Sequence, residues 1–563
     1  MKKLLPLTLL LSLVAVRVIA QTIKQAEQPS TTSARVNKLF EKWDKPTSPG
    51  CALAVIQDGR IIYKRGYGMA NLDYDIPITT TTMFHVASVS KQFTAASIVL
   101  LAQQGKLALD DPVRKYVPEL PDFGEPITIR HLIHHTSGLR DQWTLLGLAG
   151  LRYGLDRIAD ANVLEVIARQ KELNFRPGEK ILYCNTGYTL LAVIVARVSG
   201  QSLRAFTDAN IFRPLGMKNT HFRDGFDEIV KHQATGYLPA GDTFRVSATN
   251  FDTAGATSLL TTVEDLALWD QNFYDPKVGG ANFITQMRER GKLKNGEPIN
   301  YAFAQNRAQY RGLPMEEHGG ADAGFRAYLM RFPEQHFSVA FTCNAGPIET
   351  AELARKIADI YLEGKFKDEP TRTTPTLTAA QLQAKTGLYL DQESGDSIIV
   401  SVQGEQLVMQ TAGLSYRLQP ISENHFRMLE RPGEVMLESG ATPRLIRLDD
   451  RDGKSFYNLM SPFSLPASQL SDYAGDYVSE EIEPVFRLQV QGDKLMLVRL
   501  KYPAVPLQPV ARDVFLTGSG SLHFTRNAQQ QVTSFVYNLG RVRNFRMKKK
   551  VAGASSATNE IRK

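Results

Sequence analysis

The chain has 563 residues, of which 43% are hydrophobic and 22% charged, so its composition is that of a globular protein rather than a disordered one. Because a single hydrophobic core rarely exceeds about 250–300 residues, we expect more than one domain. The formal net charge is +8, and removal of an N-terminal segment that carries Lys2, Lys3 and Arg17 leaves +5. That excess is too mild to indicate nucleic-acid binding.

The first twenty residues predict a secretory signal peptide. Lys2 and Lys3 precede an apolar run over residues 4–16, and the small residue Ala20 offers a cleavage site. The run is too short to cross a membrane, and no other stretch approaches the ~20 apolar residues of a transmembrane helix. We therefore expect a periplasmic or secreted protein with no transmembrane span in the mature chain. Retention of this segment as an anchor stays open, because Arg17 interrupts the approach to the cleavage site.

Residues 21–34 are polar and predict a linker, whereas 35–367 mix strand and helix patterns. Two β-rich runs around Asp58-Gly59 predict a hairpin near the start of this segment, and residues 325–343 predict another near its end. Apolar segments with helical spacing lie between the hairpins. The pattern predicts an α/β domain whose antiparallel sheet is formed by both ends, sandwiched by helices and accompanied by an all-helical subdomain.

The C-terminal third has a different pattern. A Pro/Thr-rich segment, 368–378, predicts a linker, and strand-like alternation replaces amphipathic helices beyond it. Five positions recur 88 residues later: Leu382, Gly387, Tyr389, Gly404 and Leu407 return as Leu470, Gly475, Tyr477, Gly492 and Leu495. The repeat predicts two small all-β barrel domains, over 379–465 and 466–550, followed by a disordered tail, 551–563.

Basic residues gather near the end of the chain, at Arg541, Arg543, Arg546 and 548–550. We interpret them as the solvated end of the last strand, with attraction to an anionic cell-envelope surface as the alternative.

The three cysteines, Cys51, Cys184 and Cys343, form no Cys-x-x-Cys pattern. Cys51 and Cys343 lie in apolar runs that would suit neighbouring strands, so a disulfide between them is one option. Buried thiols are the more common outcome for such cysteines.

Ser88 and Lys91 form the only Ser-x-x-Lys in the chain, at the start of a predicted helix. A three-residue step places both side chains on one helix face, so the lysine could take the serine proton and make the hydroxyl a nucleophile. The helix N-terminus also offers backbone N–H groups to a developing oxyanion. Taken alone, the pattern is more often a surface pair.

Tyr183 and Asn185 form the only Tyr-x-Asn. A tyrosine beside a lysine can relay protons, and an asparagine can hydrogen-bond a substrate amide. The alternative interpretation is a buried tyrosine followed by a helix cap.

Together the two motifs resemble the penicillin-recognising serine hydrolases, in the branch of class C β-lactamases, D-alanyl-D-alanine carboxypeptidases, D-aminopeptidases and esterases. Further stretches resemble that branch in the same order: TIRHLIHHTSGL (128–139), PGEKILYCNTGY (177–188), PLGMKNTHF (214–222) and TTVEDLALW (261–269). The resemblance covers about residues 35–350 and implies a β-lactamase/transpeptidase-like α/β/α sandwich with an all-helical region. Two appended β domains resemble the layout of D-aminopeptidases.

The third motif of this group, Lys-Thr-Gly, lies on a strand before the last hairpin of the hydrolase domain. Here that position reads His318-Gly319-Gly320, whereas the matching tripeptide, residues 385–387, lies in the first predicted barrel. Its equivalent in the repeat is Tyr473-Ala474-Gly475, so we interpret Lys-Thr-Gly as incidental to a glycine turn.

The resemblance implies a role for each candidate residue. Ser88 would attack the carbonyl while Lys91 and Tyr183 move protons. Asn185 and His318 would orient the substrate. The remaining two positions act through the backbone: Gly320 would let the substrate approach the strand, and the N–H groups of Ser88 and Ala321 would form the oxyanion hole.

Histidine lacks the permanent positive charge of lysine, so His318 would bind a substrate carboxylate more weakly than the lysine of a β-lactamase does. We therefore expect an exported serine hydrolase that forms an acyl-enzyme with small amides or peptides, including those with D-residues. It would need no cofactor and no metal; a metal site at His131, His134, His135 and Asp141 is disfavoured. Alternatives are a carboxylesterase, a weak class C-like β-lactamase, or a non-catalytic envelope sensor or scaffold. The oligomeric state is left open.

Overall fold

The computed structural model describes residues 31–367, 375–391, 393–411, 414–429, 433–438, 443–449 and 453–550. The predicted signal peptide, the tail and most of both predicted linkers lie outside these residues. The first linker, placed at 21–34, extends too far. Its last four residues belong to helix α2 (Thr31–Phe40), because Val36 and Phe40 recur at helical spacing and are buried against the sheet.

The N-terminal domain is built on a six-stranded antiparallel sheet in the order β12-β13-β14-β15-β1-β2. The strands are β1 (Cys51–Gln57), β2 (Arg60–Tyr67), β12 (Asn306–Tyr310), β13 (Leu313–Asp322), β14 (Phe325–Phe332) and β15 (Phe337–Cys343). The two predicted hairpins, β1–β2 and β14–β15, meet where β1 pairs with β15. The expected sheet, formed by both ends of the domain, is confirmed.

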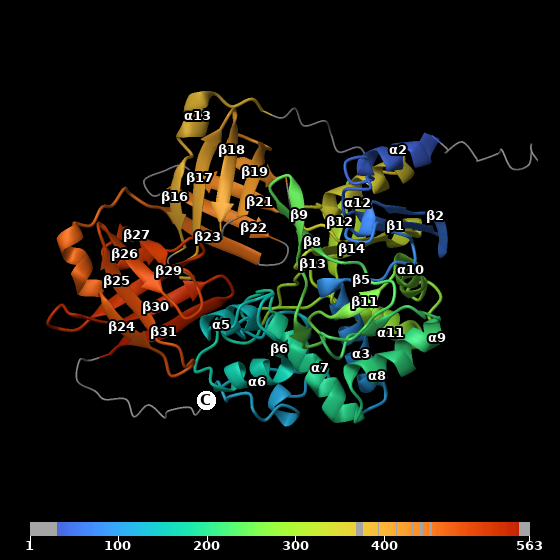
Figure 1. Ribbon diagram of the computed structural model, residues 1–563, viewed down its shortest axis with the longest axis horizontal. Coiled ribbons are helices and arrows are strands. Elements are labelled where there is room, and N and C mark those ends of the chain that lie inside the picture. Colours follow the sequence, from blue (N-terminus) through green and yellow to red (C-terminus); the bar gives the residue numbers. More distant parts are fainter. Residues whose placement is uncertain are drawn as a thin grey trace, which may run out of the picture.

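Helices cover both faces of this sheet (Figure 1). On one face, α2 and α12 (Thr350–Tyr361) pack on large residues of β1 such as Leu53 and Val55. On the other face, Ala52 and Ala54 leave room for Val263 at the start of α10 (Val263–Gln271). The alternation of large and small residues along one buried strand therefore sets how closely each helix layer approaches.

The helical subdomain is arranged around α3 (Ser90–Gln103), which is buried over nearly its whole length. It also contains α4 (Ile129–Ile133), α5 (Gln142–Leu148), α6 (Asp160–Ala168), α7 (Asn185–Ser199), α8 (Leu203–Thr207) and α11 (Gly280–Met287). All residues from Ser90 to Leu101 are buried, so every face of α3 is covered, and the helix lies at the centre of the subdomain. Among the helices in the described part of the chain, none has the length and apolar character needed to span a membrane.

Two closed barrels of eight strands follow. The first comprises β16 (Gly387–Leu390), β17 (Ser397–Gln403), β18 (Gln406–Thr411), β19 (Leu414–Pro420), β20 (His425–Met428), β21 (Glu434–Glu438), β22 (Arg444–Asp449) and β23 (Gly453–Leu459), preceded by α13 (Ala379–Gln383). The second comprises β24 (Gly475–Val478), β25 (Phe486–Gln491), β26 (Lys494–Val498), β27 (Val505–Ala511), β28 (Val514–Leu516), β29 (Gly520–Arg526), β30 (Val532–Leu539) and β31 (Val542–Lys549).

The sequence repeat corresponds to a repeated structural detail. The Tyr389 hydroxyl donates a 3.0 Å hydrogen bond to the carbonyl of Lys385, and the Tyr477 hydroxyl donates a 2.8 Å bond to the carbonyl of Tyr473. Gly387 in the first barrel and Gly475 in the second lie between the two hydrogen-bonded residues, and both have a positive φ, at 149° and 142°. The expectation of two appended all-β barrels is confirmed.

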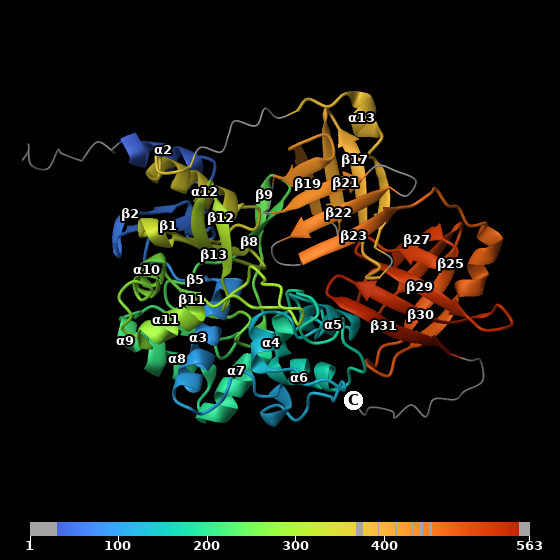
Figure 2. The same ribbon diagram turned by 180° about the vertical axis from the view of Figure 1, so that it is seen from behind.

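The second barrel lies against α5 and α6 of the helical subdomain (Figures 1 and 2). One continuous hydrophobic cluster runs from these helices into the barrel interior. Arg140, whose side chain is fully buried, forms an ion pair with Glu481 of the barrel. It also donates hydrogen bonds to the carbonyls of Arg543 and Asn544, at 2.9 and 2.8 Å. A buried cation with these partners holds the barrel in one orientation.

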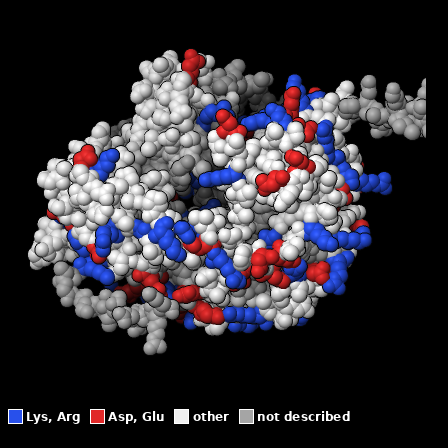
Figure 3. All heavy atoms as spheres, in the orientation of Figure 1, with Lys and Arg blue, Asp and Glu red and all other residues white. Residues whose placement is uncertain are grey.

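Basic and acidic side chains are interspersed over the face of the molecule in Figure 3, and the surface is hollowed where the N-terminal domain meets the barrels. No single-sign field of the kind that attracts nucleic acid covers this face.

Cys51 and Cys343 form a disulfide between the paired strands β1 and β15, and Cys184 is a buried free thiol. The more common outcome, buried thiols at all three positions, is therefore wrong for this pair. Cys51 lies directly opposite Cys343 in the register of β1 and β15, and the sequence alone does not predict that these two distant strands pair.

We predict that the disulfide stabilises the domain. In the denatured protein, one thiol should react with a thiol reagent before reduction and three after it. The Cys51→Ala/Cys343→Ala variant should lower the free energy of unfolding by about 2–4 kcal/mol. A Cys184→Ala control should leave the sensitivity to reductant unchanged, and three reactive thiols in unreduced protein from an oxidising compartment would contradict the assignment.

Candidate active site

Ser88 and Lys91 lie where a single 3-10 turn, η1 (Ala87–Val89), leads into α3. The Lys91 Nζ donates hydrogen bonds to Ser88 Oγ (3.1 Å), Asn185 Oδ1 (2.9 Å) and the carbonyl of Ala256 (2.7 Å). Lys91 is fully buried, whereas Ser88 is partly exposed. The serine hydroxyl is thus within reach of a ligand while its lysine partner is shielded from water.

Tyr183 lies beside this pair. Its ring centroid is 5.0 Å from Lys91 Nζ, and the ring of His135 packs on it at 4.2 Å. The Tyr183 hydroxyl is buried, and no hydrogen-bond partner for it occurs among the described residues. Because an unpaired buried hydroxyl costs free energy, the position suits a group that acquires its partner from a bound ligand.

His135 holds the tyrosine in place. Its Nδ1 accepts a hydrogen bond from the Cys184 amide (3.1 Å), and its backbone has a positive φ of 58°. Burial, followed by the positive charges of Lys91 and of neighbouring basic residues, keeps the pKa of His135 well below its usual range. His135 is therefore a neutral support for the Tyr183 ring.

Asn185 is the first residue of α7, not its cap, which is Cys184. Its amide N–H and its side-chain Nδ2 both donate to Asp141 Oδ2, at 2.8 and 2.9 Å, while its Oδ1 accepts from Lys91. The Asp141 carboxylate also compensates the positive end of the α7 dipole. Asp141, which the sequence suggested only as a disfavoured metal ligand, thus orients the asparagine that holds the lysine.

His318 lies on β13 and is buried. Its Nδ1 is 2.7 Å from the carbonyl of Gly319, which requires a proton on Nδ1, and its Nε2 is 3.0 Å from the hydroxyl of Tyr301. The rings of His318 and Tyr183 are 6.2 Å apart. The structure therefore brings His318 to the site that contains Ser88, Lys91 and Tyr183. Tyr301 comes from a segment without a recognisable motif, and sequence reasoning missed it.

Gly320 permits close contact between β13 and the serine turn, which is the 3-10 turn η1 that carries Ser88. A Cβ at this position would lie 2.2 Å from the carbonyl oxygen of Val86 and 3.2 Å from the amide nitrogen of Ser88. The sequence analysis expected Gly320 to let a substrate approach the strand; in the structure, the backbone that approaches this glycine is the protein's own. The next residue along β13, Ala321, is exposed.

Comparisons with known proteins agree with this geometry. A family model described as Beta-lactamase matches residues 36–362. The chain belongs to the β-lactamase family. A penicillin-binding protein of Bacillus subtilis is 30% identical over 444 residues, which cover 73% of this chain and 95% of the relative. A D-aminopeptidase of Gluconobacter oxydans is 26% identical over 462 residues, covering 77% and 80%.

A solved structure has the same fold. The octameric penicillin-binding protein homologue from Pyrococcus abyssi aligns with a TM-score of 0.54 and 23% identity, over 76% of this chain and all of that chain. The expected β-lactamase-like fold and family membership are thus both confirmed, and the domain is that of a serine hydrolase of this family.

A second polar group in this hydrolase lies one residue beyond Ala321. Asp322 is buried and accepts hydrogen bonds from Thr257 Oγ1 (2.9 Å) and from the Tyr153 hydroxyl, and its Oδ2 is 2.9 Å from His85 Nε2. Burial raises the pKa of Asp322, but the hydrogen bonds from His85, Tyr153 and Thr257 outweigh it and keep the pKa below its usual value. Tyr153 therefore ties the helical subdomain to the end of β13, a contact that no sequence pattern signalled.

The site also receives a residue from the second barrel. Arg541, in the turn between β30 and β31, places its guanidinium carbon 4.8 Å from the centroid of the Tyr183 ring. The expectation that the basic residues near the chain end are a solvated strand end is wrong for Arg541, and it is also wrong for Arg543, which pairs with Asp396. The hairpin docks against the hydrolase domain, and this contact brings Arg541 inward.

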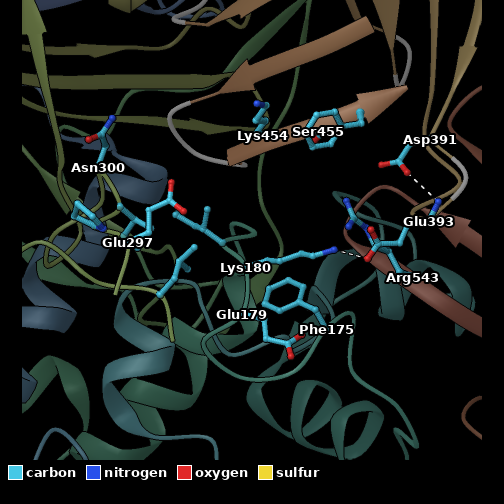
Figure 4. A pocket seen from close by; sticks show the side chains of 15 residues that line it. Phe175, Glu179, Lys180, Glu297, Asn300, Asp391, Glu393, Lys454, Ser455 and Arg543 are labelled. Carbon is cyan, nitrogen blue, oxygen red and sulfur yellow. Dashed lines mark hydrogen bonds and ion pairs between the residues drawn. The ribbon is translucent and has the colours of Figure 1, made fainter. Parts of the chain in front are cut away.

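A cavity of about 410 Å³ lies next to the site, at the junction of all three domains (Figure 4). Lys180 of the hydrolase domain and Glu393 of the first barrel form an ion pair at its edge, and Arg543 of the second barrel also lines it. Ile181 and Ile299 line the cavity and pack in one cluster with Tyr183 and Tyr301. One apolar cluster therefore lines the cavity and also supports Tyr183 and Tyr301 of the candidate site.

The Lys-Thr-Gly tripeptide and the disfavoured histidine metal site are not part of this arrangement. Lys385 of Lys-Thr-Gly is buried in the first barrel, where its Nζ donates to Asn424 Oδ1 (2.7 Å). His131 Nδ1 accepts from the Thr128 amide, and His134 Nδ1 contacts the Tyr301 carbonyl at 3.3 Å, so these two histidines point to different partners. No group of three or more ligating side chains that could hold a metal occurs within the described part of the chain.

We predict that Gly320→Ala disrupts the serine turn. The added Cβ would collide with the carbonyl of Val86, and the resulting shift of Ser88 should lower kcat/KM by about a hundredfold or more. Gly319→Ala is the matched control, because its Cβ would meet the Tyr328 ring at 3.2 Å and needs only a small adjustment. Equal activity losses in the two folded variants would contradict this account.

Proposed function

We propose that this chain is an exported serine hydrolase that cleaves small amides or peptides, including those with D-residues, through an acyl-enzyme on Ser88. The observation that carries the proposal is the 3.1 Å hydrogen bond between Lys91 Nζ and Ser88 Oγ, beside a buried Tyr183 hydroxyl with no partner in the described residues. A nucleophile, its base and a second proton carrier are what acyl transfer requires.

In the acylation step Lys91 acts as a neutral amine: its two N–H groups donate to Asn185 Oδ1 and to the carbonyl of Ala256, and its lone pair accepts the Ser88 proton as Ser88 Oγ bonds to the substrate carbonyl carbon. The carbonyl oxygen becomes an oxyanion between the N–H groups of Ser88 and Ala321, which the contact at Gly320 supports. The C–N bond then breaks, and the leaving amine takes a proton delivered through Tyr183. A water molecule next attacks the ester and is deprotonated by the same groups. This step releases the acid and restores the Ser88 hydroxyl.

The names of the relatives support the substrate class. One is a penicillin-binding protein and another a D-aminopeptidase, and the two matches cover 73% and 77% of this chain. Asn185 and His318 border the reacting groups and would orient the substrate amide. The Cys51–Cys343 disulfide supports export, because disulfides persist in oxidising compartments.

We predict that an activity-based fluorophosphonate probe labels the native protein and not the Ser88→Ala variant, because the probe reacts only with an activated serine. Ser90→Ala is a suitable control. Ser90 is two residues away and fully buried, and its Oγ accepts the Leu259 amide at 3.1 Å, so its loss should leave labelling intact. Absent labelling of the native protein, or undiminished labelling of Ser88→Ala, would favour a non-catalytic sensor instead.

We also predict that His318→Ala lowers kcat/KM about tenfold or more, because the Tyr301 hydroxyl and the substrate lose a partner. Lys385→Ala should leave kcat/KM unchanged, since Lys385 contacts Asn424 in the first barrel. Hydrolysis of D-alanyl p-nitroanilide, p-nitrophenyl acetate and nitrocefin would measure both effects. The same panel would separate an amidase from a carboxylesterase or a weak β-lactamase. Loss of turnover in Lys385→Ala alone would overturn the assignment of the third motif.

A further inference from the structure

Arg541 has no acidic partner among the described residues, whereas three other basic residues of the last hairpin have one. On β31, Arg543 pairs with Asp396, Arg546 with Glu172 and Lys548 with Glu480. Arg541 is half-buried, and its contact is with the face of the Tyr183 ring. Because a guanidinium that is partly removed from water normally finds an anion, this one is available to a ligand.

The backbone of Arg541 is held firmly. Its carbonyl accepts hydrogen bonds from the Asp141 amide (3.2 Å) and from Asn174 Nδ2 (3.0 Å). Asn174 Oδ1 in turn accepts from the Arg543 amide at 2.8 Å. The hairpin is therefore fixed on both sides of the arginine, and the side chain projects from a rigid base rather than from a loose turn.

The acidic residue that contacts the Arg541 backbone, Asp141, is already engaged through its side chain. Asp141 Oδ2 accepts two hydrogen bonds from Asn185, and its Oδ1 accepts one from the Trp143 amide at 3.1 Å. Asp141 makes no ion pair with Arg541, whose guanidinium lies against the Tyr183 ring.

Arg541 lies within reach of a small substrate. Its guanidinium carbon and Lys91 Nζ are each 5.0 Å or less from the centroid of the Tyr183 ring, so they are less than about 10 Å apart. Ser88 Oγ is 3.1 Å from that amine, which places Arg541 within about 13 Å of the nucleophile. This distance corresponds to at most about four extended residues.

We propose that Arg541 binds a carboxylate of the substrate, so that this hydrolase prefers amides or peptides with a carboxylate within about four residues of the scissile bond. The inference rests on the acyl-enzyme chemistry proposed above and narrows its substrate class. The residue on β13, His318, lacks a permanent charge, and the second barrel supplies one from a different direction. A guanidinium binds a carboxylate through two parallel N–H donors, which also fixes its orientation.

The test compares substrates that differ in one charge. Succinyl-D-alanine p-nitroanilide and its succinamyl counterpart place the carboxylate or its neutral amide in the acyl part. Acetyl-D-alanyl-D-alanine and its C-terminal amide do so in the leaving part. In at least one pair, the native enzyme should favour the carboxylate by about ten- to a hundredfold in kcat/KM, as expected for hydrogen bonds to a charged group.

Four variants of Arg541 and one control separate charge from packing. Arg541→Gln and Arg541→Met should abolish the preference while retaining turnover of the neutral substrate. The methionine variant removes the charge but still covers the Tyr183 ring, so it separates the effect of charge from that of packing. Arg541→Lys should retain part of the preference, and Arg541→Glu should reverse it. The control, Arg546→Ala, removes a cation from β31 of the same hairpin, where it pairs with Glu172, and should leave the preference unchanged. No preference in the native enzyme, or equal losses on both members of each pair, would overturn the proposal.

Binding to the Ser88→Ala variant gives a reading that does not depend on turnover. By calorimetry, acetyl-D-alanyl-D-alanine or the succinyl anilide should bind Ser88→Ala about tenfold or more tightly than Ser88→Ala/Arg541→Gln. If the native enzyme hydrolyses neither pair and takes no serine probe, the proposed hydrolase activity fails, and this binding comparison still decides the role of Arg541. Equal affinities of the two variants for both ligands would reject that role.

Discussion

The site depends on the position of a single buried amine, that of Lys91. Its three hydrogen-bond acceptors come from the serine turn, from the start of α7 and from the loop that contains Ala256. A buried lysine without its full set of acceptors would be costly, so these three segments must be in place together. The burial of α3 is part of the same requirement, because only a helix at the centre of the subdomain can present Lys91 to all three.

The second barrel contributes to this arrangement. Asp141 orients Asn185 through its carboxylate, and its own amide donates to the carbonyl of Arg541. The preceding residue, Arg140, is buried in the interface and pairs with Glu481. Two consecutive residues therefore connect the docking of the barrel with the asparagine that binds Lys91. These polar contacts lie in the same interface as the hydrophobic cluster that runs from the helical subdomain into the barrel.

Sequence reasoning found the parts of the site that local patterns encode. Ser88 and Lys91 are one helical turn apart, and the hairpin pattern located the strand that carries His318. It could not find Arg541, because that residue reaches Tyr183 across more than 350 positions and lies in an ordinary basic hairpin. Tyr301 and Tyr153 were missed for a similar reason: their contacts come from segments without periodicity or motif, which only tertiary packing positions. The disulfide likewise required the strand register.

Two features that are far apart in the sequence are related through the charge of the site. A histidine replaces the lysine of the third motif, and a cluster of arginines follows the last barrel turn. In the structure, the positive charge absent from β13 is present at Arg541, held by hydrogen bonds between domains. A charge on the strand would be fixed by the hydrolase domain alone, whereas a charge on the hairpin exists at the site only while the barrel is docked. Substrate preference and domain docking are therefore determined by the same contacts, those of Arg140, Asp141 and Asn174.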